Sequence, residues 1–259
     1  MTVKTYIINL KRSTDRKRYI TQEVSNYTFM DIEWMDAIDG KQLSQMEISS
    51  SFNTEKFVSH YHRLPAKGEI GCTLSHRKCY RQLLDSNAPY ALILEDDVSF
   101  ICPENTEYVI KEGVRLLEEG RADIILFVSK VWLYNLPHKI NSKYSAYPIY
   151  NAYGTYAYLI NRKGAKRMLK NGKEYIVGDD FPEIRKRGVR IKSIYPNITS
   201  YISNNHSFES LIDEERKTAQ ETTKYTFLER VKIYSVNMYE RLATKCGLLI
   251  NGNIFNAPL

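Results

Sequence analysis

The chain has 259 residues, of which 43% are apolar, enough for one large domain with a buried core or for one domain with an appendage. No stretch approaches the roughly 20 consecutive apolar residues of a membrane-spanning helix, and the first residues lack the apolar segment of a secretory signal, so we expect a cytoplasmic protein. The net charge of +7 favours anionic partners, whether phosphates, an acidic membrane surface or nucleic acid.

The first quarter of the chain is expected to begin with alternating strand and helix. The apolar run over residues 3–10 predicts a strand, and Ser13 is a natural N-cap for a helix whose apolar positions recur from Ile20 with helical spacing. A second strand is expected over residues 32–37. The polar residues 44–65 predict either a small excursion or a mobile loop.

Next comes the most distinctive feature, three acids at the end of an apolar strand. A helix is expected to open at Gly68, and it carries one stripe of four side chains: Cys72, His76, Cys79 and Leu83. Residues 90–94 form a continuous apolar run, typical of a strand buried on both faces. That run leads directly into Glu95, Asp96 and Asp97.

The alternation continues to the end of the domain. Helices are expected over residues 107–120 and 162–169 and just after 178–181, and strands over residues 124–128, 156–160 and 189–195. This order predicts an α/β domain over residues 1–205 with a mostly parallel sheet. A helical pattern over residues 225–242 predicts a C-terminal helical extension, residues 206–259.

Positive charge is concentrated in one stretch. Residues 162–192 contain eleven Lys and Arg and four acids, so this stretch has a net charge of +7, equal to that of the whole chain. We hypothesise that this stretch contacts an anionic membrane surface, together with basic residues of the extension: Lys224, Arg230, Lys232, Arg241 and Lys245. The alternative is an ordinary solvated surface.

The acidic strand end has two interpretations. Ligands of open α/β sheets bind beyond the carboxyl ends of strands. Adjacent carboxylates repel one another unless a cation or solvent separates them, and Mg²⁺ or Mn²⁺ prefers oxygen ligands. A metal there can bridge to a diphosphate and neutralise the charge of a leaving group. The other interpretation is a solvent-facing acidic turn.

Several separated motifs resemble glycosyltransferase family 25, which includes lipooligosaccharide and lipopolysaccharide glycosyltransferases and relatives that act on collagen. The matching segments, in order, are residues 7–10, 12–16, 36–41, 68–72, 75–76, 92–98, 161–165 and 179–181. The resemblance implies a GT-A-type, Rossmann-like nucleotide-sugar-binding fold. It also implies inverting transfer of a hexose, galactose from UDP-galactose above others, to a lipooligosaccharide or other glycan acceptor.

The resemblance also assigns roles at the acidic cluster. Glu95, Asp96 and Asp97 stand where the fold carries its metal-binding acids, so Asp97 is expected to bind Mn²⁺ or Mg²⁺ first. Glu95 or Asp96 would contact ribose or a metal-bound water, and Glu95 is a further candidate ligand. His206 is expected to supply a ligand from near the end of the domain; an ordinary surface histidine is the alternative.

Proton transfer and donor binding are expected at other positions. Asp180 is expected to act as the general base and Asp179 to position the acceptor, because inversion requires a base at the attacking hydroxyl. One of the two is also expected to cap the helix that follows. Asn9, Arg12 and Arg16 follow the first strand and are candidate donor-binding residues.

Two other functions compete with this reading. A metal-dependent hydrolase could use His60 and His62 with Glu69 or His76, although the four cysteines lack the paired spacing of a zinc site. A basic nucleic-acid-binding module is the other alternative, but the twenty tyrosines follow no recognisable nucleic-acid motif. We therefore expect no nucleic-acid partner.

Overall fold

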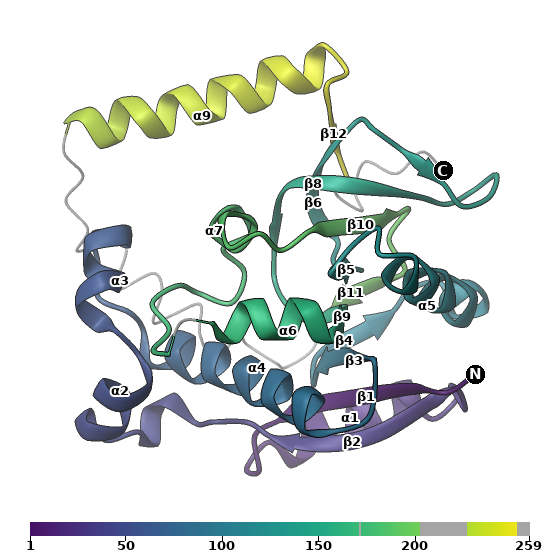
Figure 1. Cartoon of the computed structure of the whole chain (residues 1–259), viewed down its shortest axis with the longest axis horizontal. Helices are drawn as coiled ribbons and strands as arrows, with labels where there is room; N and C mark the ends of the chain where they lie inside the picture. The colour runs from purple at the N-terminus through teal and green to yellow at the C-terminus, as the bar shows by residue number, and fades with distance from the viewer. Residues whose placement is uncertain (171, 203–226, 253–259) are drawn as a thin grey trace.

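The computed structural model describes residues 1–170, 172–202 and 227–252 (Figure 1). The helices and strands in chain order are β1 (Val3–Asn9), α1 (Thr14–Val24), β2 (Met30–Asp36), the 3₁₀ helix η1 (Gly40–Gln42), α2 (Gln45–Ser51), α3 (Thr54–Tyr61), α4 (Lys67–Asp85), β3 (Tyr90–Glu95), β4 (Val98–Phe100), α5 (Pro103–Glu118), β5 (Ile124–Leu126), β6 (Lys130–Tyr134), β7 (His138–Lys139), β8 (Ser145–Tyr153), β9 (Ala157–Asn161), α6 (Arg162–Leu169), α7 (Phe181–Lys186), β10 (Ile191–Tyr195), β11 (Thr199–Tyr201), α9 (Phe227–Lys245) and β12 (Leu249–Asn251).

One ten-stranded sheet organises the fold. Its strand order is β12-β6-β8-β10-β5-β9-β3-β1-β2, with β7 paired to β8, and β4 and β11 form a separate pair. The predicted α/β class is confirmed, but the prediction of a mostly parallel sheet is wrong. In the described residues, parallel pairing joins β1 to β2 and β3, and β5 to β10, whereas the other pairs are antiparallel. Strand β9 lies antiparallel between β3 and β5, and β6 to β8 are joined by short connections that antiparallel strands allow.

Helices cover both faces of the central strands. In Figure 1, α4 and α6 lie on one side of the column of strands and α5 lies on the other. Residues 91–94 of β3 and 157–160 of β9 are almost completely buried, as expected for strands covered on both faces. The rigid centre of the sheet therefore ends, on β3, at the acidic residues.

The sequence located the helices better than their ends. Helix α6 spans the predicted residues, whereas α5 begins four residues early, because Pro103 fits the first turn of a helix. Residues 44–65 are an excursion of two short helices, capped by Ser44 and Asn53. Ser13 precedes α1 as predicted but makes no side-chain capping bond.

The C-terminal part attaches to the sheet by a strand as well as carrying a helix. Helix α9 confirms the predicted helical pattern, and β12 then pairs with β6. The expected domain boundary at residues 205 and 206 lies outside the described residues. Of the helices within the described ranges, none has the length and apolar character needed to cross a membrane.

Candidate functional site

The ends of three parallel strands form one pocket. In the register of the sheet, Ile8 lies opposite Glu95, and Asn9 lies opposite Asp36, so β1, β2 and β3 all end at the same edge. The pocket beyond this edge is lined by Ile8, Asn9, Leu10, Arg12, Arg16, Ala37, Ile38, Asp39, Gly40, Lys41, Gly68, Cys72, Ser75, His76, Glu95, Asp96 and Asp97. The topology thus collects residues that are far apart in the sequence.

Two glycines fix the pocket wall opposite the sheet. A side chain at Gly40 would collide with the backbone carbonyl of Lys67, and one at Gly71 would lie 2.5 Å from the Ile38 carbonyl oxygen. The hydroxyl of Ser75 accepts a hydrogen bond from the Ile38 amide at 2.8 Å and donates to the Gly71 carbonyl at 2.7 Å. The loop before η1 is therefore fixed on the first turns of α4.

Asp96 is held by side chains of the first strand and helix. Its Oδ2 accepts from the Asn9 amide at 2.7 Å, and its Oδ1 accepts from the Arg16 guanidinium at 2.7 Å. Burial raises the pKa of Asp96, and Arg16 and Asn9 oppose that rise. With both oxygens engaged, Asp96 joins β3 to β1 and α1 in this structure.

Among the three acids at the end of β3, Asp97 has a buried oxygen that no hydrogen bond satisfies. Its Oδ2 lies 3.4 Å from Arg16 Nη1, but Oδ1 is buried and has no hydrogen-bond partner among the described residues. Burial and the negative charge of Glu95 raise the pKa of Asp97 to about 7. A buried carboxylate oxygen without a donor fits a bound cation. Asp97 therefore fits a divalent metal better than Asp96 does.

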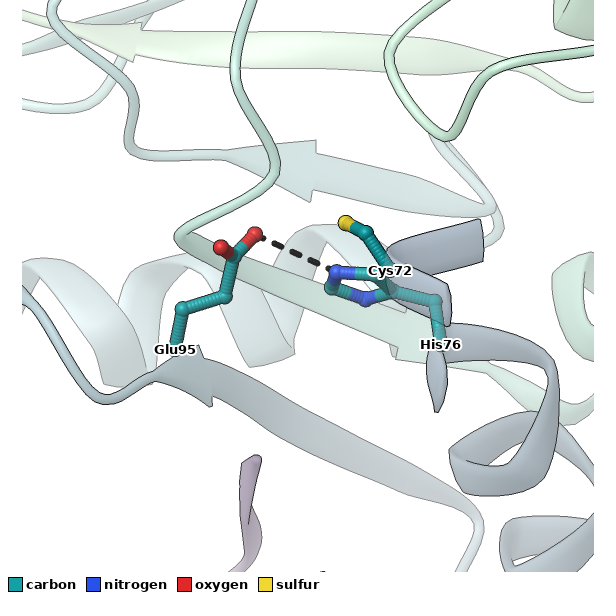
Figure 2. A group of neighbouring side chains, drawn as sticks. All are labelled: Cys72, His76 and Glu95. Atoms are coloured by element: carbon teal, nitrogen blue, oxygen red, sulfur yellow. Dashed lines mark hydrogen bonds and ion pairs between the residues drawn. The ribbon is translucent and has the colours of Figure 1, made fainter. Parts of the chain in front are cut away.

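Glu95 points to the opposite side, toward α4. Its Oε1 accepts from the Thr155 hydroxyl at 2.6 Å and lies 3.2 Å from His76 Nε2. The His76 Nδ1 lies 2.8 Å from the Tyr158 hydroxyl. Burial alone would raise the pKa of Glu95, but the bonds from His76 and Thr155 outweigh it and lower the pKa. Figure 2 shows Glu95 and His76 facing each other beside Cys72.

Asp179 and Asp180 lie on a loop next to this cluster rather than on the pocket wall. Asp180 Oδ1 accepts from the Glu183 amide and so caps α7, as expected for one of the pair. Its Oδ2 accepts from the Tyr61 hydroxyl at 2.6 Å and lies 3.3 Å from His60 Nε2. Asp179 Oδ2 accepts from the Gly154 amide at 3.0 Å, one residue before Thr155.

The residues considered for a hydrolase are dispersed. His60 faces Asp180, and the buried Glu69 forms two 2.7 Å bonds with Arg63. His76 instead lies beside Cys72 and Glu95. Within the described ranges, these three residues form the group of potential metal ligands whose ligand atoms lie close together. The geometry therefore does not assemble the hydrolase site that was considered as an alternative.

Arginines of the basic stretch mostly bind neighbouring parts of the protein. Arg162 donates to carbonyls at the end of α4, and Arg185 donates to the Ile149 and Tyr150 carbonyls. Arg187 pairs with Glu174, and Arg167 and Arg190 pair with the buried Asp123. These contacts favour a structural role for this stretch over a docking surface.

Most of the predicted site residues meet in the pocket. Its lining includes six of them: Asn9, Arg12, Arg16, Glu95, Asp96 and Asp97. His206 lies outside the described residues. Asp39, which pairs with Arg12, and Thr155, which donates to Glu95, were not among the predicted site residues. Asp39 could have been predicted as a site residue, because it follows a strand that is parallel to β1. No comparable sequence pattern marks Thr155.

Comparison with known proteins places the chain in a family. A model of "Glycosyltransferase family 25 (LPS biosynthesis protein)" matches residues 2–182. A glycosyltransferase 25 family member of Aedes aegypti is 29% identical over 180 residues, which are 64% of this chain and 27% of that protein. Procollagen galactosyltransferase 1 of Danio rerio is 27% identical over 175 residues, 64% of this chain and 28% of that protein. The match thus spans about a quarter of these relatives' length.

Solved structures resemble the fold only weakly. A Drosophila galactosyltransferase 7 mutant in complex with manganese, UDP-Gal and xylobiose has a TM-score of 0.39 and 10% identity, covering 83% of this chain and 80% of that chain. The family match extends over more than half of the chain and contains every residue of the pocket. The chain therefore belongs to glycosyltransferase family 25.

Proposed function

We propose that this chain transfers galactose, with inversion, from UDP-galactose to a lipooligosaccharide or related glycan. Membership of the family supports a glycosyltransferase, and relatives named as procollagen galactosyltransferases favour galactose. The observation that carries the proposal is the pocket at the strand ends, where Asp97 presents a buried carboxylate oxygen that accepts no hydrogen bond from the described residues. That arrangement suits a donor whose diphosphate is bound together with a cation.

Asp97 is the proposed ligand of Mn²⁺ or Mg²⁺, with Glu95 and His206 as further candidates. A cation bound there would neutralise the charge that develops on the diphosphate leaving group. Asp96 has a different role, because Asn9 and Arg16 occupy both of its oxygens. We propose that Asn9, Arg16 and Asp96 position the acidic strand end beside the sugar donor. Arg12, at the pocket wall, is proposed to contact the sugar donor directly.

The general base is proposed to be Asp179 or Asp180, and the geometry favours Asp179. Two donors already hold the Asp180 carboxylate, the Glu183 amide and the Tyr61 hydroxyl, and His60 Nε2 lies 3.3 Å from it. The Asp179 carboxylate accepts one hydrogen bond, from a backbone amide to Oδ2. The loop that carries this amide also carries Thr155, whose hydroxyl donates to Glu95. An acceptor hydroxyl between Asp179 and the pocket would lie within reach of a base.

Contact with an anionic membrane surface is proposed through α9. Val231, Tyr234, Met238 and Leu242 recur at i, i+3, i+7 and i+11 and are between 45% and 69% exposed. Arg241, also exposed, is next to this stripe in the sequence. An apolar stripe with cationic neighbours is typical of helices that lie in the membrane interface. Sedimentation with anionic liposomes at low salt tests this contact, and a protein that stays in the supernatant would refute it.

The transfer reaction is tested by supplying UDP-sugars one at a time with Mn²⁺ and a lipooligosaccharide acceptor. Asp97→Asn keeps the size of the side chain but removes its charge, so activity should fall about 100-fold or more. Asp85→Asn, at the exposed end of α4, is the matched control and should retain full activity. Full activity of Asp97→Asn would exclude the assigned metal site, and no turnover with any UDP-sugar would exclude the proposed donor.

The base is tested by the same assay. Asp179→Asn should lower kcat about 100-fold or more with little change in KM for the donor, because only proton removal from the acceptor is lost. Asp180→Asn should act mainly on stability, since it weakens the cap of α7 and the bond from Tyr61. The opposite pattern would assign the base to Asp180.

A further inference from the structure

Three side chains of different chemistry converge at one side of the pocket. Cys72 and His76 are at positions i and i+4 of α4 and so lie on one face of that helix, while Glu95 ends β3. Figure 2 shows the sulfur, the imidazole and the carboxylate turned toward a common space. One ligand atom from each lies within 4.8 Å of the other two.

These separations are close to those of a metal site. Ligand atoms of one tetrahedral zinc ion are about 3.5 Å apart, given bond lengths of about 2.0–2.3 Å. His76 Nε2 and Glu95 Oε1 are already 3.2 Å apart. The Cys72 sulfur therefore needs to move by little more than about 1 Å, which a small side-chain rotation supplies.

The ligand types select the metal. Thiolate, imidazole and carboxylate together are typical ligands of zinc, whereas Mg²⁺ and Mn²⁺ prefer oxygen alone. Asp97, with its buried carboxylate oxygen, offers the oxygen ligand that Mg²⁺ and Mn²⁺ prefer, on the other side of the strand end. The pocket thus contains two neighbouring positions with different metal preferences.

A second set of contacts orients the ligands as in zinc proteins. His76 Nδ1 lies 2.8 Å from the buried Tyr158 hydroxyl, which lies 2.9 Å from the Tyr80 hydroxyl. When Nδ1 carries the ring proton and donates it to Tyr158, Nε2 no longer donates to Glu95 and its lone pair can bind metal. Thr155 likewise fixes Glu95 through a 2.6 Å bond. Such outer contacts hold the ring and the carboxylate in place for a metal ion.

We propose that Cys72, His76 and Glu95 bind one zinc ion, and that this ion inhibits transfer. On binding, the Cys72 thiol releases its proton to solvent and the thiolate, the imidazole and the carboxylate each donate an electron pair. Because Cys72, His76 and Glu95 all line the pocket, an ion held by them would engage Glu95 and obstruct binding of the sugar donor. The inhibition rests on the proposed transferase function, whereas binding of zinc does not.

Binding is tested on the purified full chain without any activity measurement. Titration with Co²⁺ should give the thiolate-to-cobalt charge-transfer absorption in wild type, and zinc should abolish it at one equivalent. Cys72→Ala should lose this absorption and bind zinc more than about tenfold more weakly. Cys246→Ala, which removes an exposed cysteine in no disulfide, is the matched control and should behave as wild type. No absorption in wild type, or equal zinc affinity in Cys72→Ala, would refute the site.

Inhibition is tested separately in the Mn²⁺-supported transfer assay. One equivalent of zinc should stop wild type and Cys246→Ala, whereas Cys72→Ala should keep its own zinc-free rate. Zinc binding without inhibition, or zinc-stimulated hydrolysis, would overturn the inhibitory role. Absence of transfer under all conditions would refute the proposed function instead, and the cobalt spectra would still decide the site.

Discussion

A buried ion cluster around Glu174 offers the sharpest test of how the loop with Asp179 is held. Glu174 has a side chain that is 2% exposed, and it accepts from Arg77 at 2.8 Å and from both terminal nitrogens of Arg187 at 2.9 and 2.6 Å. The side chains of Arg77 and Arg187 are 3% and 9% exposed. The cluster joins α4 to the segments on both sides of Asp179.

Glu174→Gln leaves two buried guanidinium groups without their counter-charge. Removing one partner of a buried ion pair costs about 3–5 kcal/mol, and we expect the lower end because the amide oxygen still accepts one bond. The free energy of unfolding, measured by urea denaturation, should fall by about 3 kcal/mol. Glu119→Gln, in a surface ion pair with Arg115, is the control and should leave it unchanged.

The same cluster predicts a pH dependence. Burial alone would raise the pKa of Glu174, but the bonds and charges of Arg187 and Arg77 outweigh it and lower the pKa below 4.5. A carboxyl group with a lowered folded pKa stabilises the fold above its unfolded pKa and loses that contribution as the pH falls through the folded value. The stability difference between wild type and Glu174→Gln should be complete at neutral pH and shrink below pH 4.5. A difference that matches the control, or one that does not change with pH, would refute this reasoning.

Three smaller changes test other contacts by the same unfolding measurement. Gly71→Ala should destabilise by about 1–3 kcal/mol, because its methyl group would press on the backbone before Gly40, and an unchanged midpoint would contradict that close approach. Arg162→Ala should cost about 1–3 kcal/mol through lost bonds to the last carbonyls of α4, whereas a surface role predicts no change. Tyr61→Phe should cost about 1–3 kcal/mol by removing the donor to Asp180, and a neutral result would show that this bond is not needed.

The sequence was sufficient for the features that depend on local pattern. The apolar run before Glu95 and the helical pattern over residues 162–169 are local signals, and both elements are in place. Strand pairing is not local. The antiparallel strand β9 enters between β3 and β5 through contacts that no short window of sequence contains. The mostly parallel sheet was therefore the natural but incorrect expectation.

The candidate site shows the same division between local and distant information. The sequence predicts Glu95, Asp96 and Asp97 as site residues because they follow a recognisable strand. It does not predict the different environments of their three side chains. Each environment comes from a distant element: His76 and Thr155 for Glu95, and α1 with β1 for Asp96. A sequence can nominate an acidic cluster, whereas the packing of α1 and α4 around the strand end decides which oxygen remains for a cation.

The charge of the pocket explains why that oxygen matters for the donor. Four carboxylates line the pocket, those of Asp39 and of residues 95–97, against the three cations Arg12, Arg16 and Lys41. Arg12 is paired with Asp39, and Arg16 with Asp96. With all four carboxylates ionised, the pocket of the protein alone therefore carries one excess negative charge, which repels a diphosphate. A divalent cation at Asp97 reverses that excess, so the proposed donor and cation should bind together rather than independently.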